Sequence, residues 1–172
     1  MLARYIALLA VSFPNLQLIA SVVTPLTIIP SLWLLAKIDA SSTLLSSTQI
    51  FFRGHIISII PACIGVSAYF LLLILNLTTP MPILKRIKSL AFLIILFLVL
   101  NIARIVTFSF LLANEFQYFD LTHMFVWYFG STIFVVILWF ANAWLFDIDA
   151  IPIYTDIKTI FWDIFQGAKK SK

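Results

Sequence analysis

Long apolar runs separated by short polar stretches dominate the pattern of this sequence. Four of the runs approach the roughly 20 apolar residues that an α-helix needs to cross the hydrocarbon core of a bilayer. They cover residues 16–36, 61–77, 89–112 and 123–146. Residues 1–13 form a further short apolar stretch, which ends at Pro14-Asn15. The pattern predicts an all-α, polytopic membrane protein of about five transmembrane helices, within a range of four to six.

The polar stretches predict the connections between these helices. Three of them are typical of aqueous loops, and they cover residues 39–49, 78–88 and 114–122. Residues 50–60 are apolar but contain Arg53, Gly54 and His55, a combination that favours an interfacial or re-entrant segment. Pro61 suits the first turn of the helix that follows.

We expect one transmembrane domain over residues 1–146, which would also hold any catalytic site, and a cytoplasmic tail over residues 147–172. In the tail, Ile157, Ile160 and Phe161 recur at helical spacing with charged residues between them. This amphipathic pattern is suited to lying on the inner membrane surface. We therefore expect a surface anchor there.

Composition agrees with a membrane class, because 63% of the residues are hydrophobic and only 10% are charged. Soluble domains have about 25% charged residues. The net charge of +4 comes from two short clusters beside apolar runs, Lys85/Arg86/Lys88 and Lys169/Lys170/Lys172. Clusters of this kind follow the positive-inside rule of cytoplasmic loops, so they do not indicate a nucleic-acid partner.

Placing the first basic cluster inside predicts where three reactive side chains lie. Cys63 falls in the outer first turn of its helix, Arg104 one to two turns below the outer surface, and His123 in the outer first turn of the last helix. Three separate spans would thus bring a nucleophile, a cation and a base to the extracytoplasmic face of the cell membrane.

Each of the three has a functional and a structural interpretation. The positive end of a helix beginning at Pro61 would favour the Cys63 thiolate, and Gly65 would permit close approach of another chain. As the only cysteine, Cys63 cannot form an intrachain disulfide and otherwise serves as small apolar filler. Arg104 is costly within a span and shares a helix face with Asn101, although it could also reach the interface.

His123 follows Asp120 by three residues, and Asp120 or Thr122 could cap its helix. Its structural alternative is an interfacial histidine beside aromatic residues. His55 is the rival histidine on the same outer side. The two histidines and one cysteine make a weak metal site, and we expect neither a metal nor another cofactor.

The motifs Pro61-Ala-Cys63-Ile-Gly65 and Asn101-Ile-Ala-Arg104, followed by His123 at the start of a span, resemble the exosortase/archaeosortase family of membrane transpeptidases. The resemblance covers roughly residues 54–139, and the short chain is similar to the small archaeal members. Ile64 stands where that family often has serine.

The resemblance implies a cysteine enzyme whose substrates are exported proteins with a C-terminal sorting signal: a short motif, a transmembrane helix and a basic tail. It implies that Cys63 forms a thioester, Arg104 stabilises the oxyanion or the thiolate, and His123 transfers protons. The acceptor would be a membrane lipid, another amine or water. Two alternatives stay open: a non-enzymatic transporter subunit or assembly factor, and a lipid-modifying acyltransferase.

Overall fold

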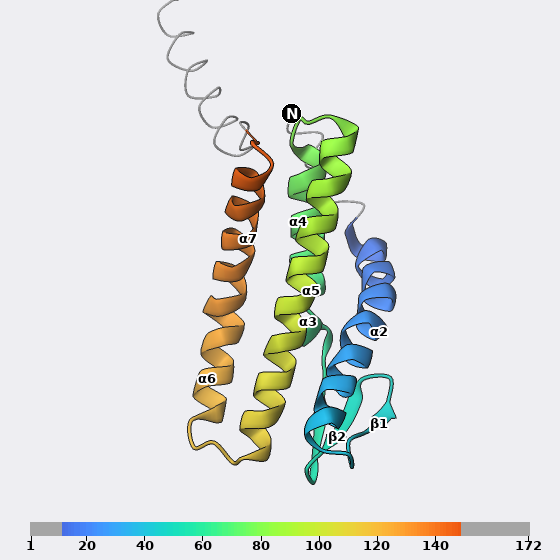
Figure 1. Ribbon diagram of the computed structural model, residues 1–172, viewed down its shortest axis with the longest axis vertical. Helices are drawn as coiled ribbons and strands as arrows, with labels where there is room; N and C mark the ends of the chain where they lie inside the picture. The colour runs from blue at the N-terminus through green and yellow to red at the C-terminus, as the bar shows by residue number, and fades with distance from the viewer. Residues whose placement is uncertain (1–11, 149–172) are drawn as a thin grey trace, which may run out of the picture.

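The computed structural model describes residues 12–148. Four helices lie side by side as a bundle (Figure 1): α2 (Ser12–Ile38), α4 (Val66–Thr78), α5 (Ile83–Ala113) and α7 (Ser131–Leu145). Three shorter helical segments complete it: α3 (Pro61–Ile64), α6 (Phe119–Phe125) and the π-helix η1 (Val126–Gly130). A small sheet lies at the end of the bundle where α5 turns into α6, opposite the α4–α5 connection (Figure 1).

Three helical stretches are long and apolar enough to cross a membrane. They are Leu16–Ile38, Ile83–Ala113 and Phe119–Leu145. Helix α4 is also apolar but has only 13 residues. Large apolar side chains such as Trp144, which is 83% exposed, cover the outside of the bundle, as expected for helices surrounded by lipid.

These features indicate a membrane protein. The described part contains three candidate spans and one shorter apolar helix, fewer than the five expected. The short stretch over residues 1–13 lies almost entirely outside the described residues, and the amphipathic tail over residues 149–172 lies outside them altogether.

The expectation of an all-α fold is wrong for residues 43–58, which form a three-stranded antiparallel sheet. Its strands are β1 (Thr43–Ser46), β2 (Gln49–Phe52) and β3 (His55–Ser58), in the order β1-β2-β3. Arg53 and Gly54 have φ values of 48° and 83°, and two positive φ angles are what a tight hairpin turn requires. The fully buried Ile50 and Phe52 anchor β2 to the helices.

The expected uninterrupted span from Pro61 is also wrong. Gly65 adopts a left-handed conformation, with φ 76° and ψ 34°, and divides the segment into α3 and α4. A side chain at this position would be strained, and a Cβ would lie 3.0 Å from Cζ of Phe97. The glycine thus combines a backbone break with close packing against α5.

Two other expected boundaries shift. Helix α2 begins at Ser12 and continues through Pro14, because a proline in the first turn gives up only an N–H that has no intrahelical partner. Helix α5 begins at Ile83, so the first basic cluster lies on its first turns and not in the loop. Lys85 Nζ donates to the Asp147 carbonyl at 2.7 Å, beyond the C-terminus of α7, where the helix dipole favours a cation.

The side chains that α5 buries recur at every fourth residue and include polar ones. These are Ser89, Leu93, Phe97, Asn101, Ile105 and Ser109. Near the basic cluster, Asn76 Nδ2 donates to Ser89 Oγ at 2.7 Å, and Ser89 Oγ donates to Asn142 Oδ1 at 2.9 Å. We call these three fully buried residues the amide network. It joins α4, α5 and α7 through polar contacts, which helices in lipid use to fix their packing.

Candidate functional site

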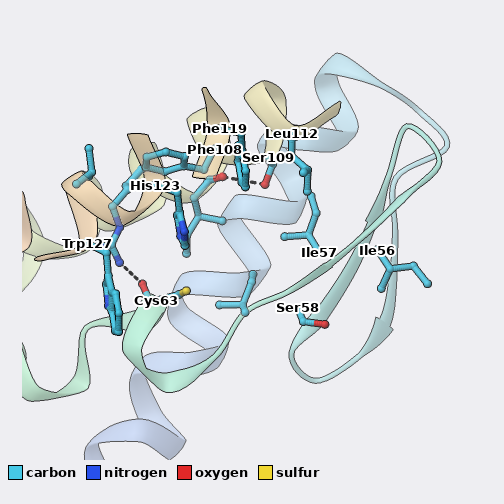
Figure 2. A pocket seen from close by; sticks show the side chains of 14 residues that line it. Ile56, Ile57, Ser58, Cys63, Phe108, Ser109, Leu112, Phe119, His123 and Trp127 are labelled. Atoms are coloured by element: carbon cyan, nitrogen blue, oxygen red, sulfur yellow. Dashed lines mark hydrogen bonds between the residues drawn. The ribbon is translucent and has the colours of Figure 1, made fainter. Parts of the chain in front are cut away.

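The three candidate catalytic side chains named from the sequence line one cavity. Its volume is about 230 Å³, and Cys63, Arg104 and His123 contribute to its wall from α3, α5 and α6. Apolar side chains of α5 and α6 and residues 56–59 form most of the remainder (Figure 2). The imidazole of His123 points toward Cys63 across this space (Figure 2). The arrangement brings a thiol, an imidazole and a guanidinium together in largely apolar surroundings.

Cys63 is half-buried on α3. We expected the positive end of a long helix to favour the Cys63 thiolate. Helix α3 has only four residues before Gly65 ends it, so it lacks the dipole of a long helix, and this expectation does not apply. The main-chain N–H of Cys63 is already bonded to the Ile60 carbonyl at 2.8 Å. Among the hydrogen bonds of the described residues none involves the sulfur atom, so the thiol itself faces the cavity without a fixed partner there.

Asn101 and Arg104 bind the two consecutive main-chain carbonyls that follow the Cys63 side chain. Asn101 Nδ2 donates to the Ile64 carbonyl at 2.7 Å, and Arg104 Nη2 donates to the Cys63 carbonyl. We call Asn101 and Arg104 the carbonyl clamp. The end of a helix leaves its last carbonyls without intrahelical partners, and in a membrane such groups must be satisfied inside the protein. The clamp therefore stabilises the break at Gly65 and holds Cys63 in place.

Arg104 makes a second contact with the last span. Its Nη1 donates to Ser131 Oγ at 2.7 Å, so one guanidinium connects α5 to both α3 and α7. A guanidinium has five N–H donors, of which these contacts use two. Donors thus remain for a group inside the cavity.

The π-helix explains how the last span presents two residues to the site. In a regular α-helix, residues eight apart such as His123 and Ser131 differ in direction by about 80°. The segment η1 lies between them, and a π-helix holds about one more residue per turn than an α-helix. This wider turn removes most of the difference in direction, so His123 and Ser131 lie on one face. His123 then lines the cavity while Ser131 reaches Arg104.

Aromatic rings fix the orientation of His123. Its imidazole stacks on Phe119 with ring centroids 5.7 Å apart and planes 3° apart, and it meets Phe108 edge-on at 5.1 Å. Asp120 lies exposed in the first turn of α6, and the N-cap position is Tyr118, which makes no side-chain cap, so capping by Asp120 or Thr122 is wrong.

His55, the rival histidine, does not line the cavity. It begins β3 and pairs with Phe52 across the hairpin. Nearby, Arg53 approaches Asp39 at 3.9 Å. The backbone N–H of Ser41, then the Ser41 side chain and Arg53, lower the pKa of Asp39.

Sequence reasoning missed two parts of the site, Ser131 and the strand β3. Ser131 lies two turns beyond His123, but its direction depends on the π-helix, for which no residue gives a signal. The strand had a signal, because Arg53-Gly54 between two short apolar runs is a hairpin pattern. Within residues 12–148 no cluster of histidine, cysteine and carboxylate side chains suited to a metal ion occurs.

No protein-family model, curated protein or solved structure matches this chain. The site must therefore be interpreted from its own geometry.

Proposed function

We propose that this protein is a membrane-embedded cysteine transpeptidase or peptidase that acts on exported proteins. The observation that carries the proposal is the shared cavity of Cys63, His123 and Arg104, contributed by three separate helical segments. Acyl transfer requires a nucleophile, a base and a fixed positive donor, and these three side chains supply them. The resemblance of their motifs to exosortases and archaeosortases adds the substrate class, proteins with a C-terminal sorting signal.

The proposed reaction begins when His123 takes the proton of the Cys63 thiol. The sulfur attacks the carbonyl carbon of a peptide bond, and the remaining N–H groups of Arg104 stabilise the oxyanion. The C–N bond then breaks, His123 donates its proton to the leaving amine, and a thioester joins the substrate to Cys63. An acceptor amine, on a lipid or another molecule, attacks the thioester, gives its proton to His123 and releases the thiolate. Water in place of the amine would give a carboxylic acid.

Charge supports an extracytoplasmic position for this reaction. The cluster of Lys85, Arg86 and Lys88 lies at the end of the bundle opposite the sheet, while β3 forms part of the cavity wall (Figure 1). Basic residues beside spans favour the cytoplasmic side. The sheet and the mouth of the cavity would then face outward, where exported proteins are found.

A non-enzymatic membrane protein is the second candidate, and one observation favours it. Both members of the carbonyl clamp bind main-chain carbonyls and thereby satisfy groups that the break at Gly65 leaves open. This role alone explains a polar pair within a span, and Cys63 would then be filler. A reactive thiol distinguishes the two candidates.

The test combines thiol alkylation with substrate cleavage. Membranes containing the wild type, Cys63→Ala or Ser109→Ala are treated with iodoacetamide, and each protein is also co-expressed with a candidate sorting-signal protein. Ser109→Ala is a matched control, because it alters the same cavity but bonds only within its own helix. Selective alkylation of Cys63, with cleavage lost only in Cys63→Ala, supports the enzyme. An inert thiol with cleavage unchanged in Cys63→Ala contradicts it.

A substitution at Arg104 tests the donor. Arg104→Lys keeps the charge, but a single ammonium cannot reproduce the planar fork that contacts both Cys63 and Ser131. We expect cleavage to fall by at least about tenfold, since hydrogen bonds from a charged group contribute about 1.5–3 kcal/mol each. Cleavage at the wild-type rate would exclude Arg104 from the mechanism.

A further inference from the structure

Strand β3 forms one wall of the cavity with its edge. Four consecutive residues, Ile56, Ile57, Ser58 and Ile59, line the cavity. Side chains alternate between the two faces of a strand, so a cavity against one face would contact only every second residue. Contact with all four indicates that the main chain itself faces the space. Figure 2 shows where Ile56, Ile57 and Ser58 lie along this strand.

The register of the hairpin shows which main-chain groups point into that space. In the sheet order β1-β2-β3, strand β3 has a neighbour on one side only. The Ile59 N–H bonds to the Thr48 carbonyl at 2.8 Å, and hydrogen-bonded pairs alternate with non-bonded ones in an antiparallel ladder. The N–H and C=O groups of Ile56 and Ser58 therefore point away from β2. No helix or loop of the described residues bonds to them, and both residues are exposed.

We propose that β3 binds the substrate as an added strand, so that an extended peptide segment pairs with the outer edges of Ile56 and Ser58. Unpaired N–H and C=O groups along a strand edge match the main chain of another extended segment. The cavity is continuous from this edge to Cys63, and a peptide paired there places its own carbonyl groups beside the thiol.

The inference rests on the proposed function, because it names the form in which a peptide substrate is held. It also explains why a small sheet accompanies helices in this fold. Pairing through the main chain would position many sequences equally, while side-chain contacts within the cavity would select among them.

The test uses photocrosslinking to the full-length Cys63→Ala protein in detergent, which needs no reactive thiol. The probe is a short end-blocked peptide of alternating valine and threonine with a diazirine, compared with the same peptide N-methylated on its main chain. A probe of this kind needs no recognised motif, because main-chain pairing does not depend on side chains. Ser58→Pro removes one outward N–H without disturbing the ladder to β2, and Ser58→Ala is its matched control.

We expect the unmethylated peptide to crosslink at residues 56–59. Methylation and Ser58→Pro should each lower the yield about two- to tenfold, the range for one main-chain hydrogen bond, while Ser58→Ala keeps it. Equal yields from both peptides would overturn strand addition, and this comparison does not depend on any variant folding. Iodoacetamide labelling of wild-type Cys63 is measured in parallel. Peptide pairing at β3 together with an unlabelled Cys63 would support the edge site and refute the enzyme. A labelled Cys63 without peptide pairing would refute only the edge site.

Discussion

Gly65 offers a sharp test of how the backbone break positions the site. Gly65→Ala places a methyl group in a left-handed conformation, which costs about 1–2 kcal/mol. The new Cβ would also lie 3.0 Å from Cζ and 3.1 Å from Cε1 of Phe97. That ring is 6% exposed and packs edge-on against Tyr69 at 4.6 Å, so it cannot move away freely. With overpacking at the lower end of its usual range, the free energy of unfolding should fall by about 2–3 kcal/mol.

Gly54→Ala is the matched control, because Gly54 has φ 83° but a Cβ at this position would meet no atom within 4 Å. Gly54→Ala should lower the free energy of unfolding only by the strain of the left-handed backbone conformation, about 1–2 kcal/mol. The assay is unfolding of the purified protein in mixed micelles with increasing SDS, followed by tryptophan fluorescence. Equal destabilisation by the two substitutions would refute the contact with Phe97. A Gly65→Ala protein as stable as the wild type would refute the left-handed break itself.

Three further predictions concern single side chains. Ser131→Ala should lower the unfolding free energy by about 1.5–3 kcal/mol in the same SDS assay, because a guanidinium loses its hydroxyl partner; an unchanged midpoint would contradict this. Ser89→Ala should cost about 1–3 kcal/mol by leaving two buried amides without partners, whereas Ser109→Ala should be nearly neutral; similar midpoints would argue against the amide network. The lowered pKa of Asp39 contributes local stability above the unfolded pKa of 3.8, and this is lost as pH falls through the folded value. Hydrogen exchange at the Ser41 amide should therefore show extra opening below pH 3.8 in the wild type and none in Asp39→Asn.

The long helices could be predicted because the bilayer imposes a length on them. Residues 89–112 lie within α5, and residues 123–146 overlap the stretch Phe119–Leu145. The shared face of Asn101 and Arg104 follows from their spacing of three residues, and both bind consecutive carbonyls of α3. The long helices could thus be predicted from composition because the membrane has a fixed thickness, and the shared face could be predicted from residue spacing because the helix has a strict period.

The sheet and the π-helix lack such constraints. Residues 50–58 are apolar enough to suggest contact with lipid, and only Arg53-Gly54 distinguishes them as a hairpin. The π-helix depends on a shift of main-chain hydrogen bonds from one carbonyl to the next, and no side chain in the sequence predicts this shift. The π-helix determines that Ser131 of α7 reaches Arg104, and the sheet determines which strand edge faces Cys63. The sequence therefore could not place either feature.

The unequal lengths of α4 and α5 have a consequence for the surrounding lipid. Thirteen residues of α4 span about 20 Å, whereas the 31 residues of α5 span about 46 Å, and the hydrocarbon core is about 30 Å thick. One bilayer cannot match both, and hydrophobic mismatch of this kind is relieved by tilting or by local thinning. Because α3 and Cys63 directly precede the short helix, the membrane would be thinnest beside the thiol. Acyl-chain length would then control how readily water and headgroups reach it.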